Sequence, residues 1–253
     1  MLSKNKQKYI RSLSQKKYRD EEKAFIAEGP KLVEELMAHF QCVLLVKTPD
    51  YKESFRLQTG TEVIVVNQME LTKVSNLKTP QSVLAVFKKP AQDSIHLQDI
   101  CKNLCLALDA IQDPGNLGTI IRIADWFGIE HIFCSTDTAD AFSPKTIQAT
   151  MGAIGRVKIH YLPLKEFILS LPNDYPIYGT FLNGENLYEK PLKTAAMIIM
   201  GNEGNGISPE IEKLVSDKIL IPNFPAGRET SESLNVAVAT AITCAEFRRQ
   251  SSL

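Results

Sequence analysis

Three short segments of this sequence combine glycines with amide, carboxylate and guanidinium side chains. They cover residues 113–122, 200–209 and 221–236. Glycine has no Cβ and readily adopts positive φ values, so glycine-rich turns can bring backbone donors and acceptors close to a ligand. The segments are therefore candidates for a site that holds a polar organic molecule.

The first segment reads Asp113-Pro114-Gly115-Asn116 and continues into a helical pattern that carries Arg122. Asn116 could cap this helix and Arg122 could be an exposed helical arginine, which is a purely structural interpretation. Its glycines do not follow G-x-G-x-x-G, and the chain has no G-x-x-x-x-G-K-[ST] phosphate loop. Alone, this segment leaves structural and functional interpretations open.

The second segment has three glycines and two asparagines within residues 201–206, directly after an apolar run that ends at Met200. Such a stretch predicts a tight loop with positive φ values, and Ser208-Pro209 then begins a helix. The loop could be a plain strand-to-helix connection. Glu203 favours function, because a carboxylate among glycines has no apolar packing role.

The third segment begins with Ile221-Pro222 and leads through Ser233, Leu234 and Asn235 into a helix. The helix has an ordinary core-facing stripe, formed by Leu234, Val238, Ala241, Ile242 and Ala245. Ser233 and Asn235 could cap this helix or contact a ligand, and the segment alone does not separate the two.

Other chemistries are disfavoured. The four histidines (His39, His96, His131 and His160) are scattered, and Cys101-x3-Cys105 has no second cysteine pair, so no metal site is predicted. The sequence also lacks a G-x-S-x-G motif that would indicate hydrolysis by a serine nucleophile.

The elements that must position these segments alternate between strand and helix from residue 103 onward. Apolar runs predict strands within residues 103–111, 131–134, 156–162, 175–182, 195–200 and 218–222. This pattern predicts an α/β fold with a mostly parallel sheet and helices on both faces. Ligands bind beyond the carboxyl ends of strands in open α/β sheets, so the three segments could converge on one site.

A smaller α/β unit precedes this part. Apolar spacing predicts a helix within residues 20–39 and a short one within 69–77, with strands at 42–46, 62–66 and 82–87. Residues 88–94 lack an apolar period and contain a proline. We therefore predict two domains, residues 1–95 and 96–253.

Composition indicates a globular protein with a neutral formal charge, 29 basic and 29 acidic side chains. Five cysteines, no apolar run near ~18 residues and no secretory h-region predict a reduced, cytoplasmic protein without a membrane span. Seven cations precede the first acid, Asp20: Lys4, Lys6, Lys8, Arg11, Lys16, Lys17 and Arg19. This arm could be a solvated, mobile segment or a contact for RNA phosphates.

Taken together and in this order, the three segments resemble the signature motifs of the SpoU/TrmH family of RNA ribose methyltransferases. The resemblance covers residues 103–249 and includes Ser143-Pro144-Lys145 and Met151-Gly152-Ala153. It implies an α/β-knot, in which the C-terminal segment threads through a loop, S-adenosylmethionine as the cofactor, and a homodimer with the site near the subunit interface. Residues 25–33 are similar to the family's small, L30e-like RNA substrate-binding domain.

The resemblance also implies a role for each residue of the site. The catalytic positions would be Asn116, Arg122, Glu203, Ser233 and Asn235, and the cofactor contacts would be Thr180, Met200, Gly201, Ile221, Pro222 and Leu234. Because the guanidinium pKa lies above ~12, Arg122 is a poor general base. We expect it to hold the target phosphate and favour the developing 2'-alkoxide, while Asn116 orients the arginine or the ribose.

The sequence departs from the family at residues 224–230, which lengthen the stretch between the Ile-Pro element and Ser233. Arg228 in this insertion could add a phosphate contact. The departure bears on the identity of the RNA more than on the chemistry.

The predicted function is methyl transfer from S-adenosylmethionine to a ribose 2'-hydroxyl in structured RNA, with ribosomal RNA favoured over transfer RNA. The alternatives are a transfer-RNA methyltransferase, a non-catalytic RNA-binding protein that kept the fold, and a methyltransferase for small molecules or proteins. The polar residues of all three motifs are present, which argues against a lost active site.

Overall fold

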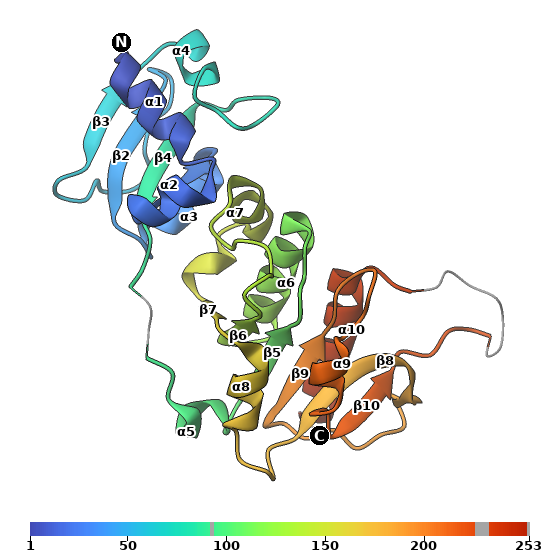
Figure 1. Cartoon of the computed structure of the whole chain (residues 1–253). Helices are drawn as coiled ribbons and strands as arrows, with labels where there is room; N and C mark the ends of the chain where they lie inside the picture. The colour runs from blue at the N-terminus through green and yellow to red at the C-terminus, as the bar shows by residue number, and fades with distance from the viewer. Residues whose placement is uncertain (92–93, 226–232, 252–253) are drawn as a thin grey trace. The chain divides into compact units, whose positions relative to one another are not determined.

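The computed structural model describes residues 1–91, 94–225 and 233–251, which divide into two compact units (Figure 1). One unit comprises Met1–Gln92 and Asp140–Arg156, and the other comprises Asp93–Ala139 and Val157–Leu253. The domain boundary predicted between residues 95 and 96 therefore differs from these two units in one respect. Residues 140–156, expected in the second domain, pack with the first unit.

The first unit is a four-stranded sheet with short helices. Its elements are α1 (Lys4–Ser12), α2 (Lys16–Glu21), β1 (Ala24–Glu28), α3 (Pro30–Met37), β2 (Cys42–Lys47), β3 (Glu62–Val65), α4 (Gln68–Thr72), β4 (Val83–Lys88), α7 (Pro144–Thr150) and the 3-10 turn η1 (Ala153–Gly155). The strand order is β1-β4-β2-β3, and only the β2–β3 pair is parallel.

The helix predicted within residues 20–39 is wrong at its beginning, because the chain forms strand β1 before α3. All five residues of β1 are buried, since helices cover both faces of this strand. A strand buried on both faces has no alternating pattern, so the sequence does not separate its short apolar run from that of the following helix. The basic N-terminal arm forms two short helices, α1 and α2.

Residues 140–156 are held against the first unit by aromatic and ionic contacts. The Phe142 ring lies 5.0 Å from the Phe25 ring. Arg19 donates to Asp140 at 2.6 Å and to two carbonyl oxygens of the α1–α2 turn. The Arg19 side chain is 3% exposed and the Asp140 side chain is 10% exposed. Removing one member of such a pair leaves an uncompensated buried charge, so this contact specifies the packing of the segment.

The second unit is a six-stranded parallel sheet with helices. Its elements are α5 (Leu97–Ile100), β5 (Leu104–Leu108), α6 (Pro114–Trp126), β6 (His131–Cys134), β7 (Lys158–Tyr161), α8 (Leu164–Leu169), β8 (Ile177–Asn186), β9 (Ala196–Met200), α9 (Pro209–Glu212), β10 (Asp217–Leu220) and α10 (Val236–Ser251). The strand order is β10-β8-β9-β5-β6-β7, and every neighbouring pair is parallel. The predicted parallel α/β sheet is confirmed.

The central strands β5 and β9 are buried along their whole length, as apolar strands covered on both faces must be. Their carboxyl ends meet, because Leu108 pairs with Met200. This edge carries the first two polar segments, and the third follows β10 at the same edge. The threading of the C-terminal segment stays a prediction, since residues 226–232 lie outside the described residues. Within the described ranges, no helix is long and apolar enough to cross a bilayer.

Candidate active site

The first polar segment begins helix α6, and Asp113 caps it. The Asp113 carboxylate accepts hydrogen bonds from the backbone nitrogens of Gly115 (2.7 Å) and Asn116 (2.9 Å). The Asn116 side chain is therefore not the helix cap. Its Nδ2 instead donates to Oε1 of Glu203 at 2.9 Å, which joins the first segment to the glycine-rich loop.

The third segment reaches the same asparagine. Asn235 Nδ2 donates to Asn116 Oδ1 at 3.0 Å, while Asn235 Oδ1 accepts from the backbone nitrogens of Ala237 and Val238 at the start of α10. Asn235 thus caps α10, which is one of the two roles that the sequence left open, and it also contacts Asn116. The result is a directed chain of hydrogen bonds, Asn235 to Asn116 to Glu203, that links all three segments.

The glycine-rich loop after β9 is a tight turn that requires glycine at two positions, 201 and 206. Asn202 and Gly206 exchange two backbone hydrogen bonds of 2.9 Å. A Cβ at Gly201 would lie 2.3 Å from the backbone carbon of Gly206, so no larger residue fits at position 201 without a backbone shift. Gly206 has a φ of +69°, which side-chain-bearing residues rarely adopt.

Two side chains to which the sequence analysis gave no role, Asp109 and Asn202, hold this loop in place. Asp109, only 7% exposed, accepts from the backbone nitrogen of Ser208 at 2.7 Å, and its own nitrogen donates to the Met200 carbonyl oxygen at 2.9 Å. Asp109 therefore holds both ends of the loop. Asn202 Nδ2 donates to the Ala110 carbonyl oxygen at 2.7 Å. The signal for Asp109 was a lone carboxylate inside the apolar run 103–111.

The predicted cofactor contacts lie along the carboxyl edge of the sheet. Gly179 pairs with Ile199, which brings Thr180 next to Met200; the Thr180 hydroxyl donates to the Ile199 carbonyl oxygen at 3.3 Å. Ile221 and Pro222 directly follow β10, which pairs with β8 further along, at Glu185 and Asn186. Leu234 comes just before α10 and is 49% exposed.

This edge suits a ligand with an apolar ring and polar substituents. Ile221 and Pro222 are half-buried, and the Leu234 side chain is exposed, so apolar surface is available beside backbone polar groups. The Ser208 hydroxyl is buried and has no hydrogen-bond partner within the described structure. The residues present therefore fit an adenosine-type ligand.

Arg122 and Ser233 are exposed and take no part in the hydrogen-bond chain formed by the described residues. Arg122 lies on α6, six residues beyond Asn116. Arg228 lies outside the described residues. The structure thus joins Asn116, Glu203 and Asn235 directly and leaves Arg122 and Ser233 available on the surface.

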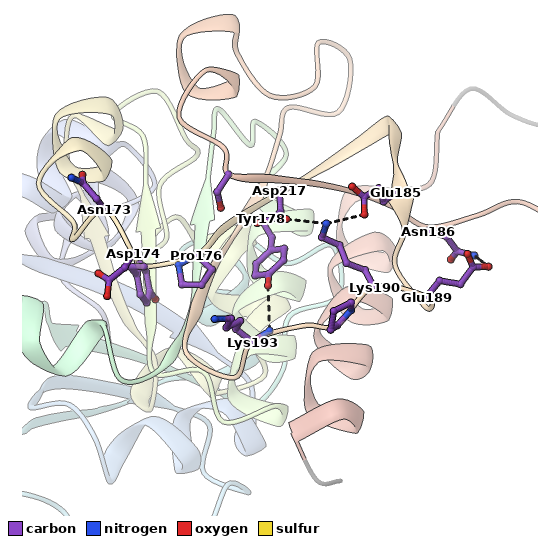
Figure 2. A pocket seen from close by; sticks show the side chains of 13 residues that line it. Asn173, Asp174, Pro176, Tyr178, Glu185, Asn186, Glu189, Lys190, Lys193 and Asp217 are labelled. Carbon is purple, nitrogen blue, oxygen red and sulfur yellow. Dashed lines mark hydrogen bonds and ion pairs between the residues drawn. The ribbon is translucent and has the colours of Figure 1, made fainter.

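A hollow of about 710 Å³ lies elsewhere in this unit and is not part of the motif site (Figure 2). It is lined by residues at the amino ends of β8 and β10, including Pro176 and Ser216, and by residues from the carboxyl end of β8 to Lys193. Lys190 lies between Glu185 and Asp217, 2.9 Å from each, and these hydrogen bonds raise the pKa of Lys190 (Figure 2). The positive charge of Lys190 is therefore neutralised by Glu185 and Asp217.

Comparison with known proteins agrees with this geometry. The model of the SpoU rRNA Methylase family matches residues 103–245, and that of the MRM3-like substrate binding domain matches residues 4–85. The chain belongs to the SpoU rRNA methylase family. The first match contains the whole hydrogen-bond chain from Asn116 to Asn235, and the predicted resemblance is confirmed.

Relatives of this SpoU family member align along nearly its whole length. The 23S rRNA (guanosine(2553)-2'-O)-methyltransferase RlmP of Bacillus subtilis is 32% identical over 94% of both chains. The structure of a TrmH-family RNA methyltransferase from Porphyromonas gingivalis has 42% identity and a TM-score of 0.88, covering 99% of both chains. An rRNA methyltransferase from Sinorhizobium meliloti, solved with S-adenosylmethionine bound, has 31% identity and a TM-score of 0.82, covering 98% of this chain and 96% of that one.

Proposed function

We propose that this protein transfers a methyl group from S-adenosylmethionine to a ribose 2'-hydroxyl of ribosomal RNA. The observation that carries the proposal is the hydrogen-bond chain from Asn235 through Asn116 to Glu203, at the carboxyl edge of the sheet of a SpoU rRNA methylase. Similarity over 94% of both chains to RlmP, a 23S rRNA 2'-O-methyltransferase by name, supports the ribose 2'-oxygen as the methyl acceptor and ribosomal RNA as the class of substrate.

Cofactor binding falls to Thr180, Met200, Gly201, Ile221, Pro222 and Leu234. The cofactor, when bound, supplies an activated methyl group on a sulfonium. Backbone groups at Met200 and Gly201 suit the polar edge of adenine and its ribose, while Ile221 and Leu234 offer apolar contact. The S-adenosylmethionine complex of the Sinorhizobium meliloti relative supports this choice of ligand.

The polar residues would position the RNA. Asn116 is held from both sides by Glu203 and Asn235, so its amide is fixed in one orientation beside the ligand edge. Such orientation can contribute up to ~7–11 kcal/mol to lowering a barrier between two bound reactants. Arg122, exposed on α6, would hold the phosphate of the target nucleotide and favour the developing 2'-alkoxide; Ser233 would complete this polar surface.

Methyl transfer to purified RNA tests the function directly. Wild-type protein with tritiated S-adenosylmethionine should label 23S rRNA from a strain that lacks the gene, and should not label rRNA from the parent strain. Mapping of 2'-O-methyl positions should find one ribose that is unmodified only in the deletion strain. Labelling confined to tRNA would establish the transfer-RNA alternative. Cofactor and RNA binding without transfer would establish the non-catalytic one.

Arg122→Ala separates chemistry from cofactor binding. We expect this variant to lose turnover while its affinity for S-adenosylmethionine, measured by calorimetry, stays within about twofold of wild type. Loss of cofactor affinity together with retained turnover would contradict the assigned role.

We further propose that the protein is a cytoplasmic homodimer. Residues 1–95 would form the RNA substrate-binding domain and residues 96–253 the methyltransferase domain, apart from residues 140–156, which pack with the first unit. Helices α6 and α10 run side by side, from the Asn116–Asn235 contact to Arg248, which donates to the Phe127 carbonyl oxygen at 2.7 Å. Trp126 on α6 is 85% exposed and Val238 on α10 is 49% exposed, so this helix pair presents apolar side chains for a partner to cover. Sedimentation analysis should show a dimer that Trp126→Glu weakens, while Leu169→Glu, at an exposed leucine of α8, should leave it intact.

A further inference from the structure

One face of the first unit collects cations that have no acidic partner. Four of the seven basic residues before Asp20 are paired with carboxylates: Lys6 with Glu62, Lys16 with Asp20, Lys17 with Glu21, and Arg19 with Asp140. Lys4, Lys8 and Arg11 have no such partner within the described part of the chain. The structure therefore divides the basic arm into a paired group and an unpaired group.

The unpaired cations form a stripe on α1. Lys4, Lys8 and Arg11 are separated by four and three residues, which places them on one face of a helix over ~10 Å. Ile10 on α1 and Leu13 directly after it are fully buried in the core of this unit. Packing of these two residues fixes the helix and directs the basic stripe away from the core.

The stripe borders a hollow that continues onto a neighbouring loop. This hollow, of about 430 Å³, lies between α1 and residues 72–76 and is lined by both Arg11 and Lys73. None of the described residues that line it is acidic, and the others offer mainly amide and hydroxyl groups. A second hollow, of about 890 Å³, shares Arg11 and extends to Lys4 and Lys8, and its lining contains one acidic residue, Glu22, beside these three cations. Arg11 thus connects two polar hollows into one surface.

The loop that carries Lys73 is held in place by a buried carboxylate. Glu28, at the end of β1, accepts hydrogen bonds from the Ser75 hydroxyl and from both the backbone nitrogen (2.8 Å) and the side-chain amide (3.1 Å) of Asn76. Burying a carboxylate is costly unless it is fully hydrogen-bonded. These bonds fix the loop, so the surface beside Arg11 exists before any ligand arrives.

We propose that this face, formed by Lys4, Lys8, Arg11 and Lys73, binds the sugar–phosphate backbone of the substrate RNA. The proposal rests on the methyltransferase function proposed above and adds where the first unit holds the RNA. Unpaired cations gain most from a polyanion, because each phosphate contact releases condensed counterions. The neighbouring amides and hydroxyls suit phosphate and sugar oxygens.

The test compares two double variants that each remove two positive charges. Arg11→Ala/Lys73→Ala changes the proposed surface, and Lys16→Ala/Lys17→Ala changes exposed cations that are paired with acids on their own helix. Binding to an in vitro transcript of 23S rRNA is measured by filter retention over a range of KCl concentrations. The first variant should bind roughly tenfold more weakly, with a salt slope less steep by about 1.4–1.8. The control should stay within about twofold of wild type.

Equal losses in the two double variants would overturn the proposal, because net charge alone would then explain binding. Arg11→Lys/Lys73→Arg should retain affinity, and circular dichroism spectra should show that every variant is folded. Methyl transfer is measured in parallel. If wild-type protein transfers no methyl group while RNA binding still depends on Arg11 and Lys73, the proposed function fails and this surface stands. If transfer proceeds but the two double variants bind alike, the function stands and the surface fails.

Discussion

Replacing Asn116 with aspartate should break one bond of the hydrogen-bond chain and leave the other intact. An aspartate at 116 can still accept from Asn235 Nδ2, but it cannot donate to Glu203 Oε1, which lies 2.9 Å from the present amide nitrogen. Two carboxylates would then face each other. Their repulsion at ~4 Å lies between about 1 kcal/mol in water and about 4 kcal/mol near a protein surface. The lost hydrogen bond adds about 1 kcal/mol.

Because this part of the site is open to solvent, we take the lower part of that range, about 2–3 kcal/mol. If the oriented amide is needed in the transition state, kcat/KM for RNA methylation should fall about 30- to 150-fold. Tritium transfer under subsaturating RNA measures this ratio. Calorimetry should show S-adenosylmethionine affinity changed by less than about threefold, since no predicted cofactor contact is altered.

The matched control exchanges donor and acceptor. In Asn116→Asp/Glu203→Gln the glutamine amide can donate to the new aspartate, so the bond is restored with reversed polarity. The double variant should recover most of the lost rate. Activity of the double variant at or below that of Asn116→Asp, or a wild-type rate for Asn116→Asp alone, would refute the view that this bond orients the site.

Three further predictions follow from the described contacts. Asp109→Ala should lower the free energy of unfolding in urea by about 1–3 kcal/mol and weaken cofactor binding, because the half-buried Ser208 nitrogen loses its acceptor. Asp109→Asn keeps an acceptor and should lose less. Equal losses in the two variants would show that the hydrogen bond is unimportant. Gly201→Ala should abolish S-adenosylmethionine binding in calorimetry, since its Cβ would meet backbone at 2.3 Å, while Gly204→Ala, whose nearest contact is 3.6 Å away, should bind normally. In native protein at pH 8, iodoacetamide should label Cys101 before any other thiol, because the other four cysteines are buried. Labelling of those four should accelerate as the pH rises. Mass spectrometry that finds a buried thiol modified first would contradict this prediction. Burial raises the pKa of Cys42 to about 11 and of Cys105 and Cys244 to about 12, and it raises the pKa of Cys134 as well.

The parallel sheet was predictable because its strands are short apolar runs between turn signals, as in 131–134 and 195–200, and these lie within one residue of β6 and β9. Strand β1 was not, because its apolar residues stand directly before those of α3, and no alternation separates the two patterns. The packing of residues 140–156 with the first unit was also beyond sequence reasoning. It depends on a contact between Arg19 and Asp140, 121 residues apart.

By itself, the sequence determined the chemical groups of the candidate site and the strand ends on which they are carried: asparagine and arginine after one strand, glutamate among glycines after another, and asparagine at a final helix. Only the tertiary structure decided which of these groups meet. Asn116 and Glu203 are 87 residues apart and Asn116 and Asn235 are 119 apart, so their contacts depend on β5 lying next to β9 and on α10 packing beside α6. The structure also showed that Asp113, not Asn116, caps α6, which leaves the Asn116 amide available for its partners. Local sequence sets which bonds a side chain can make, and the fold sets which partner is within 3 Å.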